Sequence, residues 1–167
     1  MMRLPPLIML ALSATLAAGP VAAHSDSHAK KSAMPTTTGA EEKSFGKPAD
    51  AKKAARTITV DMSDRMRFTP AALTVKQGET VKFVVKNSGQ TMHEFVLGTM
   101  AELKTHAELM KKHPGMEHDE PYMAHVAPGK TETIVWQFTR SGEFHFGCLL
   151  PGHFEAGMVG NINVTAR

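Results

Sequence analysis

The residues most able to do chemistry lie in one short passage near the C-terminal end of the chain. Cys148, His153 and Met158 place a thiolate, an imidazole and a thioether within eleven residues, with four residues in each gap. Soft sulfur ligands combined with imidazole suit copper. Two histidines and one cysteine with a weak methionine ligand are typical of electron-transfer copper sites. The passage therefore predicts a copper site that needs a second histidine from elsewhere.

His93 is the candidate for that second histidine, because it directly precedes a strand-like run that begins near Phe95. His145 lies in another strand-like run, where alternate side chains face opposite sides, so we expect it to point away from the metal. The predicted metal ligands are four side chains: His93, Cys148, His153 and Met158.

Each sulfur ligand also has a simpler interpretation. An isolated cysteine is more often a buried apolar residue than a ligand, and an isolated methionine more often fills the core. Cys148 is the only cysteine, so no internal disulfide can form. A lone exposed thiol in an oxidising compartment is a liability unless it is buried or bound. The combination of residue types and spacing favours ligation.

Short β-branched and aromatic runs, separated by turn residues, must position these ligands. The runs cover residues 57–62, 66–68, 73–75, 81–85, 95–97, 131–138, 144–146 and 159–164. Runs of this length between Asn-Ser-Gly, Pro-Gly and Ser-Gly turns predict an all-β sandwich.

One segment breaks the strand pattern. Residues 100–112 contain four apolar side chains at roughly helical spacing, namely Leu103, Ala107, Leu109 and Met110. Pro114 and Gly115 follow and stop the pattern. We expect a short helix inserted between strands, followed by a loop to about Ala124.

The N-terminal residues 1–23 resemble a secretory signal peptide. Arg3 supplies the basic end, residues 7–16 an apolar run, and Val21-Ala22-Ala23 a small-residue cleavage site. A membrane anchor is the alternative, but a span needs about 20 apolar residues. We therefore expect export to the periplasm and cleavage after Ala23.

Residues 24–56 predict a flexible, His/Lys-rich linker, because a segment rich in Ser, Ala, Lys, Thr and Pro cannot bury enough apolar surface to fold. The folded domain is then expected over residues 57–167.

The chain carries a formal charge of +3, and this near balance of basic and acidic residues argues against nucleic acid as a partner. We expect a monomer without a transmembrane segment in the mature chain, whose partners are copper and a redox protein.

The ligand passage, together with Gly142–Phe146 and the runs from Met66 to Val81, resembles the cupredoxins, the small blue-copper proteins. The resemblance covers about residues 57–166 and implies a Greek-key β-sandwich that holds one type 1 copper ion. The ligand gaps are similar to those of rusticyanin, whereas plastocyanins have a shorter first gap. In this resemblance His153 lies near the surface, within an apolar patch through which electrons pass.

Met92–Gly98 resembles a bacterial exported subgroup linked to copper tolerance. In plastocyanin and azurin an asparagine commonly follows the first histidine and braces the loop that bears the cysteine. Glu94 stands at that position here, so the resemblance does not imply this brace. A residue in contact with a ligand orients the ligand and tunes the metal, so the substitution matters for the site.

Further histidines and methionines suggest accessory copper sites. His113, Met116, His118, Met123 and His125 lie within thirteen residues, and cleavage after Ala23 would leave His24 with a free amine. Met and His side chains can bind copper. The alternatives are a solvated loop over the sandwich edge and an ordinary linker.

These patterns leave three classes of function open. The first is copper tolerance or copper handling by a redox-active site. The second is a dedicated respiratory electron carrier with no role in copper resistance. The third, an oxidase or nitrite reductase, is disfavoured because Gly147 and Leu149 flank Cys148, where multicopper oxidases have histidines. We therefore expect a protein that is not an enzyme.

Overall fold

The structure is a computed structural model that describes residues 42–114, 116 and 118–167. The first sheet contains β1 (Lys47–Pro48), β2 (Arg56–Ser63), β3 (Arg67–Thr69), β5 (Thr80–Asn87) and β8 (Thr131–Gln137). The second sheet contains β4 (Ala72–Lys76), β6 (His93–Gly98), β7 (Met123–Val126), β9 (Gly142–Gly147) and β10 (Val159–Thr165). The α-helix α1 spans Met100–Lys112, and a short 3-10 helix spans Ala51–Lys53.

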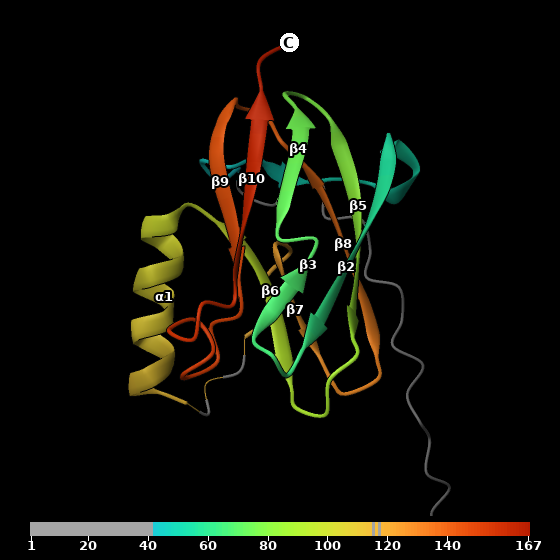
Figure 1. Cartoon of the computed structure of the whole chain (residues 1–167). Helices are drawn as coiled ribbons and strands as arrows, with labels where there is room; N and C mark the ends of the chain where they lie inside the picture. Colours follow the sequence, from blue (N-terminus) through green and yellow to red (C-terminus); the bar gives the residue numbers. More distant parts are fainter. Residues whose placement is uncertain (1–41, 115, 117) are drawn as a thin grey trace, which may run out of the picture. The chain divides into compact units, whose positions relative to one another are not determined.

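The strands form two five-stranded sheets, in the orders β1-β8-β5-β2-β3 and β4-β10-β9-β6-β7. Helix α1 lies outside the second sheet, beside β6 and β9 (Figure 1). Most neighbouring strands are antiparallel, but β2 pairs with β5 and β4 pairs with β10 in parallel. The predicted all-β sandwich with one inserted helix is confirmed, and each predicted strand run overlaps a strand of the structure.

Strand β6 is buried on both of its faces, which explains the unbroken apolar run from Phe95 to Leu97. Phe95 and Leu97 face the main core, whereas Val96 belongs to a second cluster under the helix. The ring of Phe95 stacks on that of Phe146 in β9, with centroids 4.9 Å apart. These two strands carry the predicted ligands His93 and Cys148 at their ends, so the stacked pair fixes both strands two residues from each ligand.

Helix α1 begins with a capping box in which the Thr99 hydroxyl accepts from the Glu102 N–H and the Glu102 carboxylate accepts from the Thr99 N–H. Its buried side chains pack in one cluster with β6, β7 and the residue after Cys148; they are Leu103, Ala107 and Met110. Leu109, expected on the same face, is 43 % exposed. The helix therefore covers the start of the ligand loop at Leu149.

The folded part begins before Thr57, so the expected linker boundary at residue 56 needs correction. Phe45 is buried against the ring of Trp136, at 5.2 Å between centroids, and its carbonyl accepts a hydrogen bond from Trp136 Nε1. Strand β1 pairs with β8 at the edge of the first sheet. A single aromatic side chain thus anchors a segment whose composition otherwise indicates a linker.

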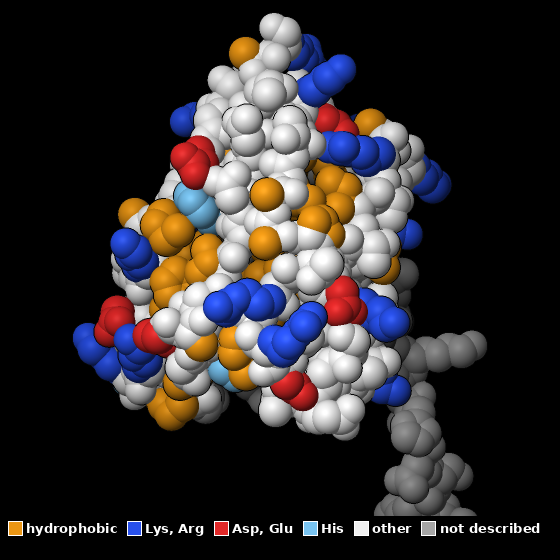
Figure 2. Space-filling model, viewed as in Figure 1, with side chains coloured by type: hydrophobic (Ala, Val, Ile, Leu, Met, Phe, Trp, Pro, Cys, Tyr) orange, Lys and Arg blue, Asp and Glu red, His pale blue; other side chains and the backbone are white. Residues whose placement is uncertain are grey.

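Several expectations lie outside the described residues. They are the signal peptide at 1–23, the linker from 24 to 41 and the metal-binding terminus at His24. Within the described part of the chain, no helix has the length and apolar character needed to cross a bilayer. On the face shown in Figure 2, basic and acidic side chains are spread over the surface with hydrophobic side chains between them.

Phe45→Ala tests whether the N-terminal segment belongs to the folded unit. We expect the free energy of unfolding to fall by about 3 kcal/mol, because the change removes a buried ring and leaves a cavity. Chemical denaturation monitored through the fluorescence of the single tryptophan measures the loss. Lys47→Ala, at an exposed position of β1, is the control and should change stability by less than about 0.5 kcal/mol. Equal stability of the two variants would contradict this boundary.

Candidate metal centre

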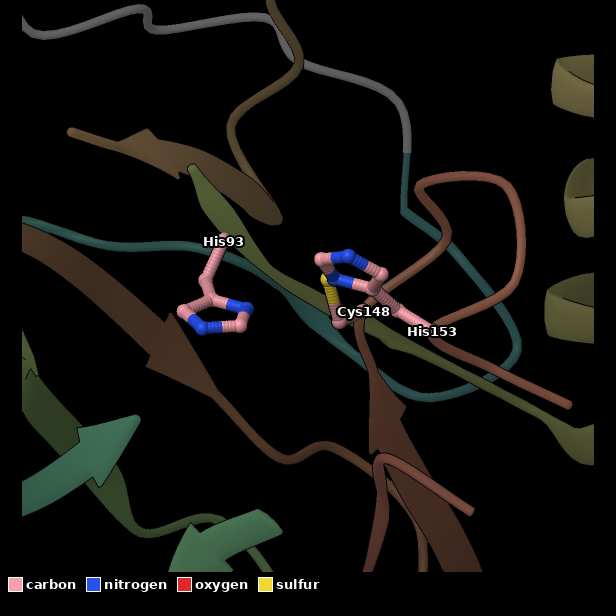
Figure 3. Close-up of side chains that lie close together, drawn as sticks. All are labelled: His93, Cys148 and His153. Carbon is pink, nitrogen blue, oxygen red and sulfur yellow. The ribbon is translucent and has the colours of Figure 1, made fainter. Parts of the chain in front are cut away.

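Three of the four predicted ligands come together in the structure. His93 is the first residue of β6, Cys148 follows β9 directly, and His153 lies in the turn between β9 and β10. One potential ligand atom from each lies within 4.8 Å of the others. Figure 3 shows the three side chains pointing toward one another from separate segments. Residues distant in sequence thus form one compact group of nitrogen and sulfur donors.

The Cys148 sulfur is fully enclosed by protein. It accepts a hydrogen bond from the Glu94 N–H at 3.3 Å, and it lies 3.2 Å from His153 Nδ1. Burial raises the pKa of the Cys148 thiol to about 12, despite the opposing effect of that hydrogen bond. Without a cation the sulfur is therefore protonated at neutral pH, and metal binding must displace the proton.

The two histidines present nitrogen atoms to the same space. Nδ1 of His93 is buried without a hydrogen-bond partner among the described residues, which is unusual for a polar atom in a core. Burial, with His93 nearby, lowers the pKa of His153, so its ring is neutral at pH 7. The buried unpaired nitrogen of His93, the imidazole of His153 and the Cys148 thiol fit copper, because this mixture of soft and borderline donors is the one copper prefers.

Met158 is fully buried beside this group and is held through its main chain. Its carbonyl accepts from the Cys148 N–H at 3.1 Å, and its N–H donates to the His153 carbonyl at 3.0 Å. Gly152 and Gly157 bound the turn with φ near +88°, a conformation that favours glycine. The turn places Met158 next to Cys148 and His153, while its role as a ligand remains a prediction.

Glu94 braces the ligand loop, although the sequence left this open. Its buried carboxylate accepts a hydrogen bond from the Leu149 N–H at 3.2 Å. The other carboxylate oxygen lies 3.0 Å from His125 Nδ1, close enough for an ion pair but not aligned as a hydrogen bond. Burial raises the pKa of Glu94, and the neighbouring His125 opposes that rise. The glutamate thus ties the cysteine loop to β7.

Asp64 contacts the predicted ligand His93, and the sequence analysis missed this contact. It follows β2, and its carboxylate lies 3.3 Å from His93 Nε2, on the side of the ring away from Nδ1. The N–H of Gln90 donates to it, and this bond is the main reason why its pKa falls to about 2. An aspartate 29 residues before a histidine gives no local signal in the sequence.

Two histidines of the predicted accessory site, His118 and His125, lie near Glu94. The ring of His118 is 4.7 Å from that of His106 in α1 and 6.4 Å from that of His125, between centroids. His113 is exposed and Met123 is buried. In the described residues, no second group of three His, Cys, Asp or Glu side chains is as close as the first. Accessory copper binding here therefore stays a prediction.

His145 lies 3.7 Å from Glu143, outside the main group, as expected.

Comparison with known proteins agrees with this geometry. Residues 54–165 match the family described as copper binding proteins, plastocyanin/azurin family. The chain is 52 % identical to the copper-resistant cuproprotein CopI of Rubrivivax gelatinosus, over 85 % of this chain and 81 % of that protein. It is 38 % identical to the copper-resistant cuproprotein CopI of Pseudomonas aeruginosa, over 75 % and 84 % respectively.

The fold has solved counterparts. Dithionite-reduced auracyanin from the photosynthetic bacterium Roseiflexus castenholzii superposes with a TM-score of 0.58 at 22 % identity, over 67 % of this chain and 98 % of that one. At this identity the likeness concerns the fold alone, and it supports the two-sheet arrangement described above.

The high pKa of Cys148 predicts that copper(II) binding depends on pH. Because the thiol is protonated below its pKa, each bound ion releases one proton, and the apparent affinity should rise about tenfold per pH unit near neutrality. Competition titrations at pH 7 and pH 8 against a chelator of known pH dependence measure this slope. Cys148→Ser should lack it, and an equal slope in both proteins would contradict the assignment.

Glu94→Ala should destabilise the metal-free protein by about 1–3 kcal/mol, because it leaves the buried Leu149 N–H without its acceptor. Glu94→Gln should cost less, since the amide oxygen can still accept that bond. Urea denaturation measures both. Glu143→Ala is the control, since Glu143 is 68 % exposed near His145 and should cost about 1 kcal/mol or less. Similar costs for Glu94→Ala and Glu143→Ala would show that the brace is unimportant.

Proposed function

Because the chain belongs to the plastocyanin/azurin family of copper-binding proteins, we propose that it is an exported type 1 copper protein that serves in copper tolerance through a redox-active site. The observation that carries the proposal is the grouping of His93, Cys148 and His153, with ligand atoms within 4.8 Å of one another. A Cys-His-His group of this kind matches the donors of electron-transfer copper sites.

Each side chain has a distinct proposed role. Cys148 would bind copper as the thiolate, after loss of its proton. His93 and His153 would bind it through imidazole nitrogens, and Met158 would supply a weak thioether ligand. Copper, when bound, supplies one-electron chemistry. The protein keeps the ligands in place and excludes water from the sulfur, since Cys148, His93 and Met158 have no exposed surface.

The relatives favour copper tolerance over a purely respiratory role. Two proteins that are 52 % and 38 % identical to this chain are described as copper-resistant cuproproteins. The alternative is a dedicated respiratory electron carrier with no part in copper resistance. A redox-active site serves either task, so the site alone does not decide between them. One-electron exchange with a protein partner is compatible with both.

We also propose that the protein is not an enzyme and that it works outside the cytoplasm. Gly147 and Leu149 flank Cys148, so the histidine route by which multicopper oxidases pass electrons to a second centre is missing. Residues 1–23 have the pattern of a secretory signal peptide, which supports export to the periplasm. Copper-dependent oxygen consumption by the purified protein would contradict the first statement.

A visible absorption spectrum tests the site. With one equivalent of copper(II), the mature protein should show an intense thiolate-to-copper band, and Cys148→Ser should show none because the sulfur donor is gone. Met158→Leu, which keeps a similar apolar volume, should retain the band in altered form. A folded parent protein without the band would mean that this group is not a type 1 site.

A deletion strain tests the biological role. Loss of the protein should lower the copper concentration that the bacterium tolerates while respiration stays normal. The parent gene should restore growth on copper, and the Cys148→Ser gene should not, because it lacks the sulfur ligand. Normal copper tolerance together with impaired respiration would instead support the dedicated electron carrier.

A further inference from the structure

The carboxylate of Asp64 occupies a defined place behind the first histidine. Its Oδ1 lies 3.3 Å from Nε2 of His93, whose ring is completely buried, whereas the Asp64 side chain is 39 % exposed. The nitrogen on the other side of the ring, Nδ1, faces the group formed with Cys148 and His153. Asp64 therefore contacts the histidine without reaching the metal position itself.

The carboxylate is held by the loop before β6 and does not depend on His93 for its position. Oδ2 accepts from the Gln90 N–H at 2.7 Å, and Oδ1 accepts from the Thr91 hydroxyl at 2.8 Å and the Thr91 N–H at 3.2 Å. A Cβ atom at Gly89 would lie 2.2 Å from Oδ1, so the close approach of this loop needs glycine. Asp64 is thus set in place by main-chain donors.

This contact selects one tautomer of His93. An ionised carboxylate only accepts hydrogen bonds, so the nitrogen that faces it must carry the proton. The Thr91 hydroxyl, 3.4 Å from the same nitrogen, donates its own proton to Asp64. When the ring carries its single proton on Nε2, its lone pair is on Nδ1, the nitrogen without a hydrogen-bond partner in the described part of the chain. Such outer carboxylates orient metal-binding histidines and raise their basicity.

We propose that Asp64 is a positioning residue of the copper centre: it holds His93 as the Nε2–H tautomer, and its negative charge stabilises copper(II) relative to copper(I). The inference rests on the proposed function, since it takes His93 as a ligand. A carboxylate in this position is worth about 10- to 100-fold in metal affinity. A fixed negative charge acts more strongly on the more highly charged ion.

Asp61 offers a matched control. It is a carboxylate near the same end of β2, and it accepts a hydrogen bond from Ser88, in the same loop, at 2.7 Å. No contact joins Asp61 to His93 in the described structure. Asp61→Asn therefore removes one charge and perturbs the same loop, but leaves the tautomer of the histidine alone.

The test is redox titration of the copper-loaded protein, followed through its visible band. Asp64→Asn should weaken copper(II) relative to copper(I) by about tenfold, which raises the one-electron potential by about 59 mV. Asp64→Ala should have the larger effect, because it also removes the acceptor. Asp61→Asn should change the ratio by less than about twofold, because the more distant charge is screened.

Nitrogen NMR of the metal-free protein, labelled at histidine, gives a second readout. The parent should hold His93 as the Nε2–H tautomer, and Asp64→Ala should mix both tautomers. Potentials of the Asp64 variants equal to that of Asp61→Asn, or a parent ring protonated on Nδ1, would overturn the inference. If Asp64→Ala does not fold, the comparison of the two asparagine variants still decides. Failure of the proposed function looks different, because the parent itself would then lack the visible band.

Discussion

A buried contact between the start of β6 and the end of β9 supports the rest of the site. There the N–H of Glu94 donates to the Cys148 sulfur, and the Glu94 carboxylate accepts from the Leu149 N–H. One residue thus restrains both the sulfur and the loop that follows it. The stacked rings of Phe95 and Phe146 hold the same two strands from the core side. Ligands from distant parts of the chain can therefore meet without help from a metal.

This arrangement has an electrostatic cost. A thiol, two imidazoles and a carboxylate lie together where water is excluded, and burial there opposes ionisation of both Cys148 and Glu94. His125, which faces Glu94 across the sheet, and main-chain donors around the loop partly stabilise the charged forms of these groups. A bound cation would stabilise the Cys148 thiolate directly. Copper affinity, proton release and stability are therefore linked in this site.

Much of the fold and most of the site could be predicted from the sequence, since both depend on local patterns. Alternating runs indicated the strands, and the spacing of Cys148, His153 and Met158 indicated the loop. Three features could not be predicted. Phe45 anchors a polar segment through one distant ring, β7 has little β propensity of its own, and Asp64 reaches His93 only through tertiary packing. Each depends on a long-range contact that leaves no periodic pattern.

We propose that the sandwich holds the copper ligands in place before copper arrives. Crystal structures of the metal-free and the copper(II)-loaded protein test this proposal most directly. The donor atoms of His93, Cys148 and His153 should occupy the same positions in both, within about 0.5 Å, as expected for a preorganised site. A metal-free structure in which His93 or Cys148 turns away from the group, or in which the loop refolds around the ion, would contradict it.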